Sequence, residues 1–130
     1  MSSSPALDIT DETLVVAAPE RVREVLCDEV YWERWLPGVR LRCIDDRDLL
    51  GKRWSVSGTM TGSAEVWLEP WADAVVVHVF WQVDLADGRA LDARTHRRYE
   101  LEVKARVTVV KDRLEAGRAP GTPRATPAGE

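Results

Sequence analysis

Hydrophobic and polar residues alternate with a period of two through three neighbouring segments in the middle of the chain. The segments cover Arg53–Gly58, Ser63–Glu69 and Ala74–Leu85. A period of two is typical of β-strands with one buried face, because successive side chains point to opposite sides of a sheet. Short turns separate the segments, the first near Thr61-Gly62, and Pro70 is predicted to end the second strand. The pattern therefore predicts a curled antiparallel sheet.

Two further strands and two short helices are predicted before these segments. β-branched residues favour a first strand over Asp8–Ala17, and Pro19 suits the first turn of a helix, where its missing N–H is not needed. A second short helix is predicted to hold the aromatic residues of Tyr31–Leu36 and to break at Pro37-Gly38. Alternation over Val39–Ile44 predicts another strand. The total is about five strands, with a bent pair of helices after the first.

The C-terminal segment fits two periods. Its apolar residues alternate as in a strand, yet a second set lies at spacings of three and four, as on one side of a helix. That set is Tyr99, Val103, Val107, Val110 and Leu114. Because the helical stripe continues past the alternation toward a stop at Gly117, the pattern favours a long C-terminal helix.

The composition is that of one small domain. The chain has 130 residues, 45% of them hydrophobic, which is enough for a single core. We expect a flexible N-terminus over residues 1–7, a folded domain over 8–117 and a disordered tail over 118–130, where Ala, Pro, Gly and Thr predominate. The net charge of −4 disfavours nucleic acid and anionic membranes as partners. No apolar run has the length of a secretion signal or a membrane span, which predicts a cytoplasmic protein without membrane insertion.

Cysteine usage and motif content argue against a metal or a cofactor. Cys27 and Cys43 have neither CxxC spacing nor a histidine cluster beside them, so both are predicted to be buried, reduced thiols. The sequence has no P-loop, no dinucleotide glycine pattern and no serine nucleophile elbow. We therefore expect no metal site and no cofactor.

Four local motifs give the chain a family resemblance. They are Ala18-Pro19-Glu20-Arg21-Val22, Trp35-Leu36-Pro37-Gly38, the segment from Gly62 to Glu69 and the segment from Val110 to Arg118. Together with the order of elements, they resemble an actinobacterial branch of the START-like (SRPBCC) superfamily, the polyketide cyclase/dehydrase and lipid transport family. The resemblance implies an α+β helix-grip fold, in which a curved antiparallel sheet wraps around a long C-terminal helix. Members usually have six or seven strands, so about five strands imply a smaller or more open cavity.

In a helix-grip fold the concave face of the sheet meets the long helix, and a continuous apolar set predicts a pocket wall there. The wall residues are Trp54, Val56, Val66, Leu68, Val77, Val79, Trp81, Val103, Val107 and Val110, with Trp35 and Tyr99 at the mouth. Such a wall suits an apolar or aromatic small molecule, since indole faces supply contact area and a tyrosine hydroxyl orients the ligand. The alternative is that the same residues form a filled hydrophobic core.

Few polar residues are candidates for catalysis. His78 and Phe80 share one face of their strand, and Glu65 and Trp67 occupy one face of the preceding strand. An enclosed pair of His78 and Glu65 would suit general acid–base chemistry, with Tyr99 as a further polar group. If that face is convex, His78 lies instead in solvent or in an oligomer contact. The large aromatic side chains of Trp67 and Phe80 then fit a homodimer surface.

Three functions are consistent with these observations. The favoured one is the binding of an apolar or aromatic small molecule between the sheet and the C-terminal helix, without covalent catalysis. An aromatic polyketide cyclase or dehydratase is implied by the resemblance and would need polar groups inside the pocket. A homo-oligomeric interaction protein with a filled core is the third.

Overall fold

A computed structural model describes residues 4–116 of the chain. Its strands are β1 (Leu7–Val15), β2 (Val39–Asp46), β3 (Gly51–Gly58), β4 (Met60–Trp71) and β5 (Ala74–Leu85), and its helices are α1 (Pro19–Leu26), α2 (Glu29–Glu33) and α3 (Ala93–Leu114), with a 3₁₀ turn η1 (Asp48–Leu50). The predicted fold class is confirmed. A five-stranded antiparallel sheet is followed by a long helix, and two short helices come after the first strand.

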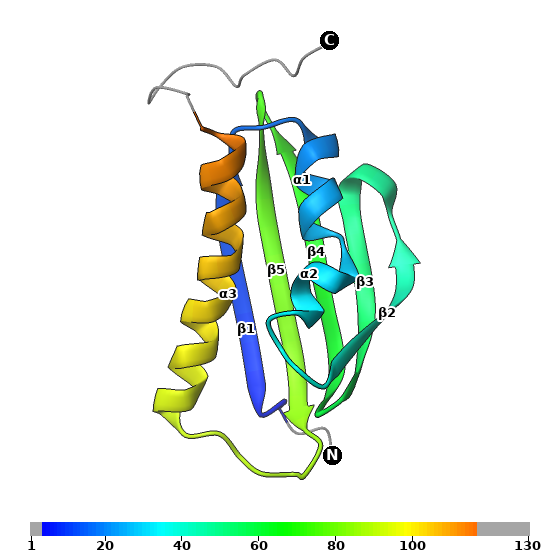
Figure 1. The fold of residues 1–130 in the computed structure, drawn as a ribbon, viewed down its shortest axis with the longest axis vertical. Helices are drawn as coiled ribbons and strands as arrows, with labels where there is room; N and C mark the ends of the chain where they lie inside the picture. The colour runs from blue at the N-terminus through cyan, green and yellow to red at the C-terminus, as the bar shows by residue number, and fades with distance from the viewer. Residues whose placement is uncertain (1–3, 117–130) are drawn as a thin grey trace.

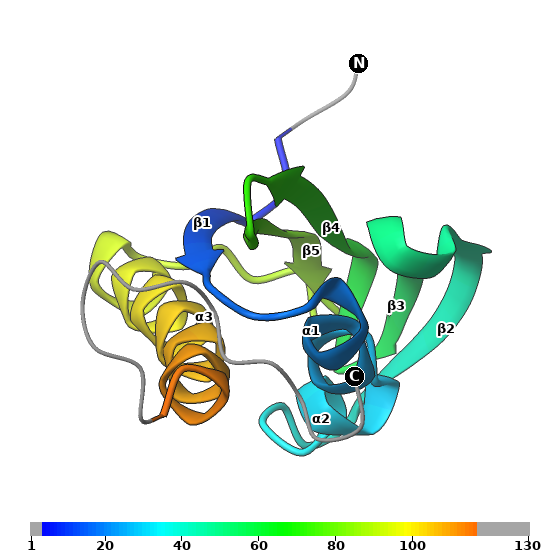
Figure 2. The ribbon, with the colours of Figure 1, turned by 90° about the horizontal axis from the view of Figure 1, so that it is seen from above.

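The sheet has the strand order β1-β5-β4-β3-β2, and every neighbouring pair is antiparallel. α3 runs beside β1, and α1 and α2 cover the neighbouring part of the same face (Figure 1). Seen from above, all three α-helices lie on one side of the strands (Figure 2). We call the helix-covered side the inner face and the opposite side the outer face.

The two short helices are joined by a hydrogen bond from an indole. α1 begins at Pro19 as predicted, and the Nε1 of Trp32 in α2 donates to the carbonyl of Leu26 at 2.8 Å. α2 is shorter than predicted, because it ends at Glu33 and leaves Trp35 in the connection to β2. Pro37 lies in this connection and disfavours helical geometry in Leu36, the residue before it.

The ambiguous C-terminal segment is a helix, as its longer period predicted. α3 buries Val103, Val107, Val110 and Leu114, which are the stripe at spacings of three and four. The side chain of Asp92 accepts from the backbone N–H of Thr95 at 2.7 Å and caps the first turn. This backbone hydrogen bond is the main cause that lowers the pKa of Asp92 below its ordinary value. The predicted stop at Gly117 and the predicted tail lie outside the described residues.

Two turn predictions were wrong. The corner between β3 and β4 lies at Thr59, and Gly62 is inside β4, where a Cβ would approach the carbonyl oxygen of Gln82 to 2.2 Å. β4 also continues through Pro70 to Trp71. The β3 pairing stops at Trp67, so Pro70 has a strand partner only on its β5 side, where a sheet tolerates a proline.

The two cysteines differ in exposure, which corrects the prediction that both are buried. Cys27 is buried, and this burial raises the pKa of its thiol to about 11. Cys43 is exposed because it lies on β2, the last strand of the sheet, next to a register shift between Cys43 and Asp45. The thiolate is the reactive form, so Cys27 is the less reactive of the two.

A carboxylate connects α2 to the middle of the sheet. The Oε2 of Glu29 accepts from the Nζ of Lys52 at 3.0 Å and from the Nε1 of Trp54 at 2.7 Å. Burial acts to raise the pKa of Glu29, but the hydrogen bonds from Trp54 and Lys52 outweigh it, and the pKa lies below its ordinary value of 4.5. The carboxylate form therefore stabilises the folded state.

Glu29→Gln is expected to lower the free energy of unfolding by about 1 kcal/mol at neutral pH, because the amide loses the ion pair with Lys52. The wild-type advantage is fully present above the ordinary pKa of 4.5 and is lost as the pH falls through the lowered folded-state pKa. Urea unfolding of both proteins across this pH range measures it. Glu24→Gln, at an exposed position of α1, is the control. A difference that stays constant in acid would contradict the assignment.

Candidate ligand-binding groove

The predicted pocket wall is the hydrophobic core of the structure. The residues predicted for the wall on the sheet and on α3 belong to one cluster, and each is at most 4% exposed. They are Trp54, Val56, Val66, Leu68, Val77, Val79, Trp81, Val103, Val107 and Val110. Their side chains fill the space between the sheet and α3, so the place where a ligand can enter is set by the residues at the edge of this core.

Aromatic rings lead from the core to that edge. Trp32 and Trp81 are buried with ring centroids 6.2 Å apart, and Trp35 lies 6.1 Å from Trp81. Tyr99 follows at 6.4 Å from Trp35, and both of these rings are partly buried. The edge-to-face angles of 89° and 67° are favourable for aromatic pairs. The two residues predicted for the mouth thus lie together at the end of an aromatic series.

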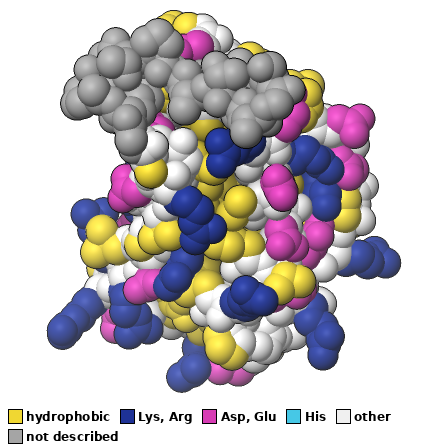
Figure 3. All heavy atoms as spheres, turned by 45° about the horizontal axis from the view of Figure 1, so that its top comes forward, with side chains coloured by type: hydrophobic (Ala, Val, Ile, Leu, Met, Phe, Trp, Pro, Cys, Tyr) yellow, Lys and Arg dark blue, Asp and Glu magenta, His cyan; other side chains and the backbone are white. Residues whose placement is uncertain are grey.

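A groove of about 310 Å³ opens at these two rings. It is lined by Trp35, Leu36, Pro37, Val39, Thr59, Met60, Arg98, Tyr99 and Glu102. Further hollows of about 340 and 330 Å³ share Tyr99 and follow the connection from β5 to α3. A band of hydrophobic side chains is visible on the surface between α3 and the α1–α2 pair (Figure 3). The groove therefore combines an aromatic floor with polar side chains from α3 and from the β3–β4 corner.

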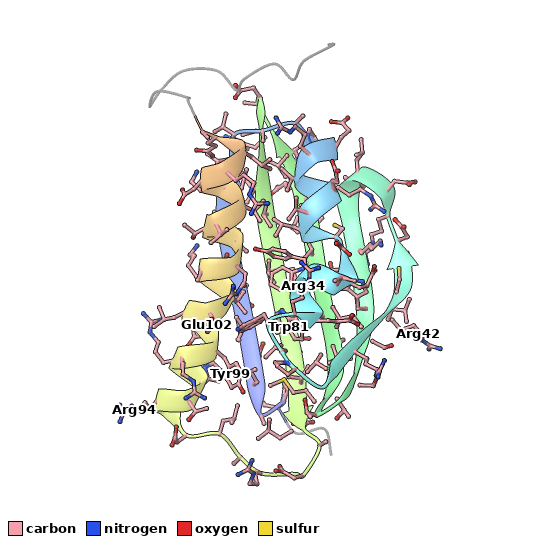
Figure 4. All side chains as sticks on the ribbon, in the orientation of Figure 1. Arg34, Arg42, Trp81, Arg94, Tyr99 and Glu102 are labelled. Carbon is pink, nitrogen blue, oxygen red and sulfur yellow. The ribbon has the colours of Figure 1, made fainter. Side chains whose placement is uncertain are left out.

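The polar side chains come mainly from α3. The guanidinium of Arg98 lies 5.7 Å from the ring centroid of Tyr99, within the range of a cation–π contact. Glu102 accepts from Arg106 at 3.2 Å one turn further along the helix. Tyr99 and Glu102 project from α3 near Trp81 of the sheet (Figure 4). The groove thus offers aromatic faces with a cation above one of them.

A tyrosine outside the groove fixes the position of α3. The hydroxyl of Tyr31 donates to the carbonyl of Arg106 at 2.6 Å, which connects α2 to the middle of α3. Burial raises the pKa of Tyr31, so the hydroxyl keeps its proton and remains a donor. This contact holds the two sides of the groove at a defined separation.

The predicted pairing of His78 with Glu65 was wrong, and the carboxylate partner is Glu69. The Nε2 of His78 lies 2.9 Å from Oε1 of Glu69, and Nδ1 lies 3.9 Å from Oε2 of Glu12. The register places Glu65 opposite Phe80, because the β4–β5 hairpin closes in a tight turn and extends the pairing to Trp71 and Ala74. Tyr99 lies on the inner face, so the three catalytic candidates do not form one site.

The outer face buries His78 more than expected. The histidine is only 9% exposed, since it stacks on Trp67 with centroids 4.3 Å apart and is near-parallel to Phe80 at 6.4 Å. Trp67 lies directly opposite His78, and Trp67 and Phe80 are both partly buried. The most exposed aromatic residue of this face is Trp71, at 62%. Continuing the alternation of β4 through Pro70 would have identified it.

Sequence reasoning also misses part of the groove. The sequence pattern predicts a turn near Thr61-Gly62 and gives no role to Thr59 and Met60 before it. It assigns Arg98 to a solvated basic surface. In the structure all three residues line the groove. His96 is expected at the surface, but it is partly buried and its Nδ1 lies 3.1 Å from Glu100. The groove residues come from three separate places in the chain, the α2–β2 connection with the start of β2, the β3–β4 corner and α3, so no local motif marks them.

Solved structures share this fold. The chain is similar to the solution structure of the Aha1 dimer from Colwellia psychrerythraea, with a TM-score of 0.65 and 12% identity over 87% of this chain and 99% of that one. It is similar to CalU16 from Micromonospora echinospora, with a TM-score of 0.61 and 8% identity over 87% of this chain and 77% of that one. For DynU16, from the dynemicin biosynthetic locus, the TM-score is 0.57 with 16% identity over 85% of this chain and 48% of that one.

These comparisons show a helix-grip fold. No protein-family model and no curated protein matches the sequence. Across residues 4–116 there is no helix with the length and apolar character to span a membrane. The same described residues hold no cluster of histidine, cysteine or acidic side chains suited to a metal ion.

Proposed function

We propose that the protein binds an apolar or aromatic small molecule in the groove between Trp35 and Tyr99. The observation that carries the proposal is the series of aromatic rings that leads from buried Trp81 to these two residues, where the groove opens. A planar ligand placed there extends the series and covers rings that are only partly buried. Since the inner core is filled, the ligand occupies the edge of the fold rather than its centre.

The charges at the groove favour a ligand with an acidic group. Arg98 lies above the ring of Tyr99 and is the cation that carries this argument. Arg89 lines the neighbouring hollows that also contain Tyr99, but its guanidinium pairs with Asp87 at 2.6 Å. The charge of Glu102 is balanced by Arg106 at 3.2 Å. An aromatic ring with a carboxylate, sulfonate or phenolate group matches this arrangement, because the ring meets aromatic faces and the anion meets the guanidinium of Arg98.

An aromatic polyketide cyclase or dehydratase is the weaker proposal. Its catalytic candidates His78 and Glu65 are on the outer face, while Tyr99 lines the groove on the inner face. General acid–base catalysis needs its groups within hydrogen-bonding reach of one reacting molecule. DynU16 is described as a protein in the dynemicin biosynthetic locus, and its likeness to this chain is one of fold. The actinobacterial branch and the cytoplasmic location stay predictions.

A homodimer is compatible with ligand binding, because the groove and the outer face lie on opposite sides of the sheet. The neighbour from Colwellia is described as a dimer, which supports self-association as a property of this fold. Ligand binding in the groove is therefore the observation that separates the proposed function from the alternative of an interaction protein with a filled core.

Native mass spectrometry beside the denatured mass is the first test of that question, because an apolar ligand often survives purification. A mass difference per chain that disappears on denaturation would show an occupied groove. The same preparation then gives the ligand-free protein for titration with dyes.

Two dyes separate aromatic binding from anion binding. Anilinonaphthalene sulfonate carries an anionic group, and N-phenylnaphthylamine is its uncharged analogue. Tyr99→Ala is expected to weaken the binding of both dyes about three- to tenfold, which corresponds to the loss of one ring contact. Arg98→Gln is expected to weaken the sulfonate about threefold and to leave the uncharged dye unchanged. Fluorescence titration measures both dissociation constants.

Trp71→Ala is the matched control, because Trp71 is 62% exposed on the other side of the sheet. If this variant weakens the dyes as much as Tyr99→Ala, the dyes bind elsewhere and the groove assignment is wrong. If the wild type binds neither dye and carries no ligand in native mass spectrometry, the proposal of a binding function fails.

A further inference from the structure

The outer face of the sheet has an aromatic centre that none of the α-helices within residues 4–116 covers. Trp67 and Phe80 lie on either side of His78, and the ring of Trp67 stacks on the imidazole at 4.3 Å. Leu14 on β1 and Trp71 on β4, the two strands that flank β5, are 43% and 62% exposed on the same face. Exposed apolar groups gathered around buried aromatic rings are typical of a surface that a protein partner covers.

Charges of opposite sign lie at the two edges of this face. Asp8 and Glu12 are exposed on β1, which is the first strand in the sheet order. Arg40 and Arg42 are exposed on β2, the last strand, and Arg42 points away from the molecule at that edge (Figure 4). Arg53 lies on β3 beside it. The face is thus acidic at the β1 edge and basic at Arg40 and Arg42 of the β2 edge. Its aromatic centre also holds Glu65 and Glu69, which pair with Arg47 and His78.

The strand registers place the opposite charges in one row. Asp8 is opposite Gln82, which is opposite Ser63, and this row continues through Ser55 to Arg42. A row runs perpendicular to the strands, so Asp8 and Arg42 lie on the two edges at the same position along the strand direction. Their distances from the central strand β4 are matched, since each is two strands away.

We propose that a second copy of this chain covers the outer face, related by a two-fold axis that runs parallel to β4. Such an axis reverses the order of the strands across the sheet and keeps the position of each residue along the strand direction. It therefore brings the acidic β1 edge of one copy over the basic β2 edge of the other. Asp8 then faces Arg42 of the second copy, and Arg42 faces Asp8 of the second copy. This self-complementarity is what a two-fold interface requires.

The same operation gives the aromatic centre a suitable partner. β4 lies over β4 of the second copy, which brings the two Trp67 side chains together near the axis. β5 lies over β3 of the second copy, and Phe80 shares its row with Arg53, so each aromatic ring meets a guanidinium. A two-fold axis perpendicular to the strands would instead place the acidic β1 edge over the acidic β1 edge of the second copy. The parallel axis also brings Glu65 and Glu69 near their own copies, but each carboxylate has a partner within its own chain, Arg47 at 3.1 Å and His78 at 2.9 Å.

The size of the face is adequate for a dimer. Five strands about 4.8 Å apart, each presenting about 25 Å of length, give a face of roughly 600 Å² before side-chain relief is added. This is close to the roughly 800 Å² that each partner contributes to an interface of standard size. Face-to-face packing of two twisted sheets is an ordinary arrangement, with the strands crossing at about 30°.

A charge-swap experiment tests the arrangement. The dimer dissociation constant of the wild type, Asp8→Arg, Arg42→Asp and the double variant D8R/R42D is measured by sedimentation equilibrium over a range that includes micromolar concentrations. Each single variant places like charges in two symmetry-related contacts, and the dissociation constant is expected to rise at least about 100-fold. The double variant restores opposite charges and is expected to return to within about tenfold of the wild type.

Arg94→Asp is the control for a change in net charge, because Arg94 is exposed on α3 away from the outer face. It is expected to leave the dissociation constant unchanged. Circular dichroism confirms that each variant is folded, and the double variant remains informative if one single variant is not.

Three results would overturn the proposal. A wild type that stays monomeric over the whole range would leave the outer face to a different partner. A dimer that both single variants leave intact would place the interface elsewhere. A double variant that dissociates as readily as the single variants would show that Asp8 and Arg42 do not face each other across the axis.

Discussion

Trp81→Ala is expected to lower the free energy of unfolding by about 3–5 kcal/mol, which is the usual cost of truncating a buried tryptophan. Trp81 is 2% exposed and contacts the rings of both Trp32 and Trp35. The alanine removes the ring that joins the core to the groove and leaves a cavity that the strand β5 cannot close. Urea unfolding followed by circular dichroism measures the loss.

Trp71→Ala serves as the matched control for this prediction. Trp71 is on the adjacent strand but is 62% exposed in the single chain. At protein concentrations where the chain is monomeric, its truncation is expected to change the unfolding free energy by no more than about 0.5 kcal/mol. Equal losses in the two variants would mean that the core does not extend to Trp81. Binding of N-phenylnaphthylamine should also fall in Trp81→Ala, because Trp35 loses its ring partner.

Gly58→Ala is expected to destabilise the protein by about 3 kcal/mol or more, from backbone strain and a steric clash together. Gly58 has a φ of +97°, and a Cβ there would lie 1.9 Å from the carbonyl oxygen of Gly38. That carbonyl accepts a hydrogen bond from the N–H of Thr59 at 3.0 Å, so it has little freedom to move. The thermal unfolding midpoint and the urea midpoint are both expected to fall.

Gly88→Ala separates the two causes. Gly88 also has a positive φ, of +77°, but a Cβ there would have no atom within 4 Å, so only the conformational cost of about 1 kcal/mol applies. If Gly58→Ala lowers the free energy of unfolding by no more than Gly88→Ala does, the close approach of Gly58 to the carbonyl of Gly38 is contradicted. Because Thr59 lines the groove, Gly58→Ala should also weaken dye binding in the protein that remains folded.

The sheet could be predicted from the sequence because its signal is local and redundant. Along β5, every second residue from Val75 to Val83 is buried, and a slip by one residue would turn that whole set toward solvent. The long helix could be predicted because its stripe of apolar residues reaches Leu114, beyond the alternation that also fits a strand. Both inferences use a period repeated many times.

The errors arise where one residue type serves two purposes. Glycine is typical of turns, yet the lack of a side chain at Gly62 allows β4 to approach the carbonyl of Gln82 within the sheet. Proline is typical of strand ends, and ending the strand at Pro70 makes the hairpin loop too long and moves the expected partner of His78 to Glu65. The tight turn after Trp71 sets the true register and brings Glu69 to His78.

The groove depends on information that a single sequence does not carry. Trp35 and Tyr99 are expected at the mouth of the pocket that the helix-grip resemblance implies. Thr59, Met60 and Arg98 line the same groove only because the β3–β4 corner and α3 come to opposite sides of it in the folded chain. Long-range packing of this kind has no periodic signature.

The pairing of β1 with β5 has a consequence for how the chain becomes native during synthesis. β1 leaves the ribosome first, but Val15 pairs with Val75 and Leu7 with Val83, so its partner is made much later. β3, β4 and β5 can meanwhile form by local closure, at a smaller loss of chain entropy. Until β5 and α3 emerge, Ile9 and Val15 have no cover, and the nascent chain presents an apolar strand to chaperones and to incorrect pairing.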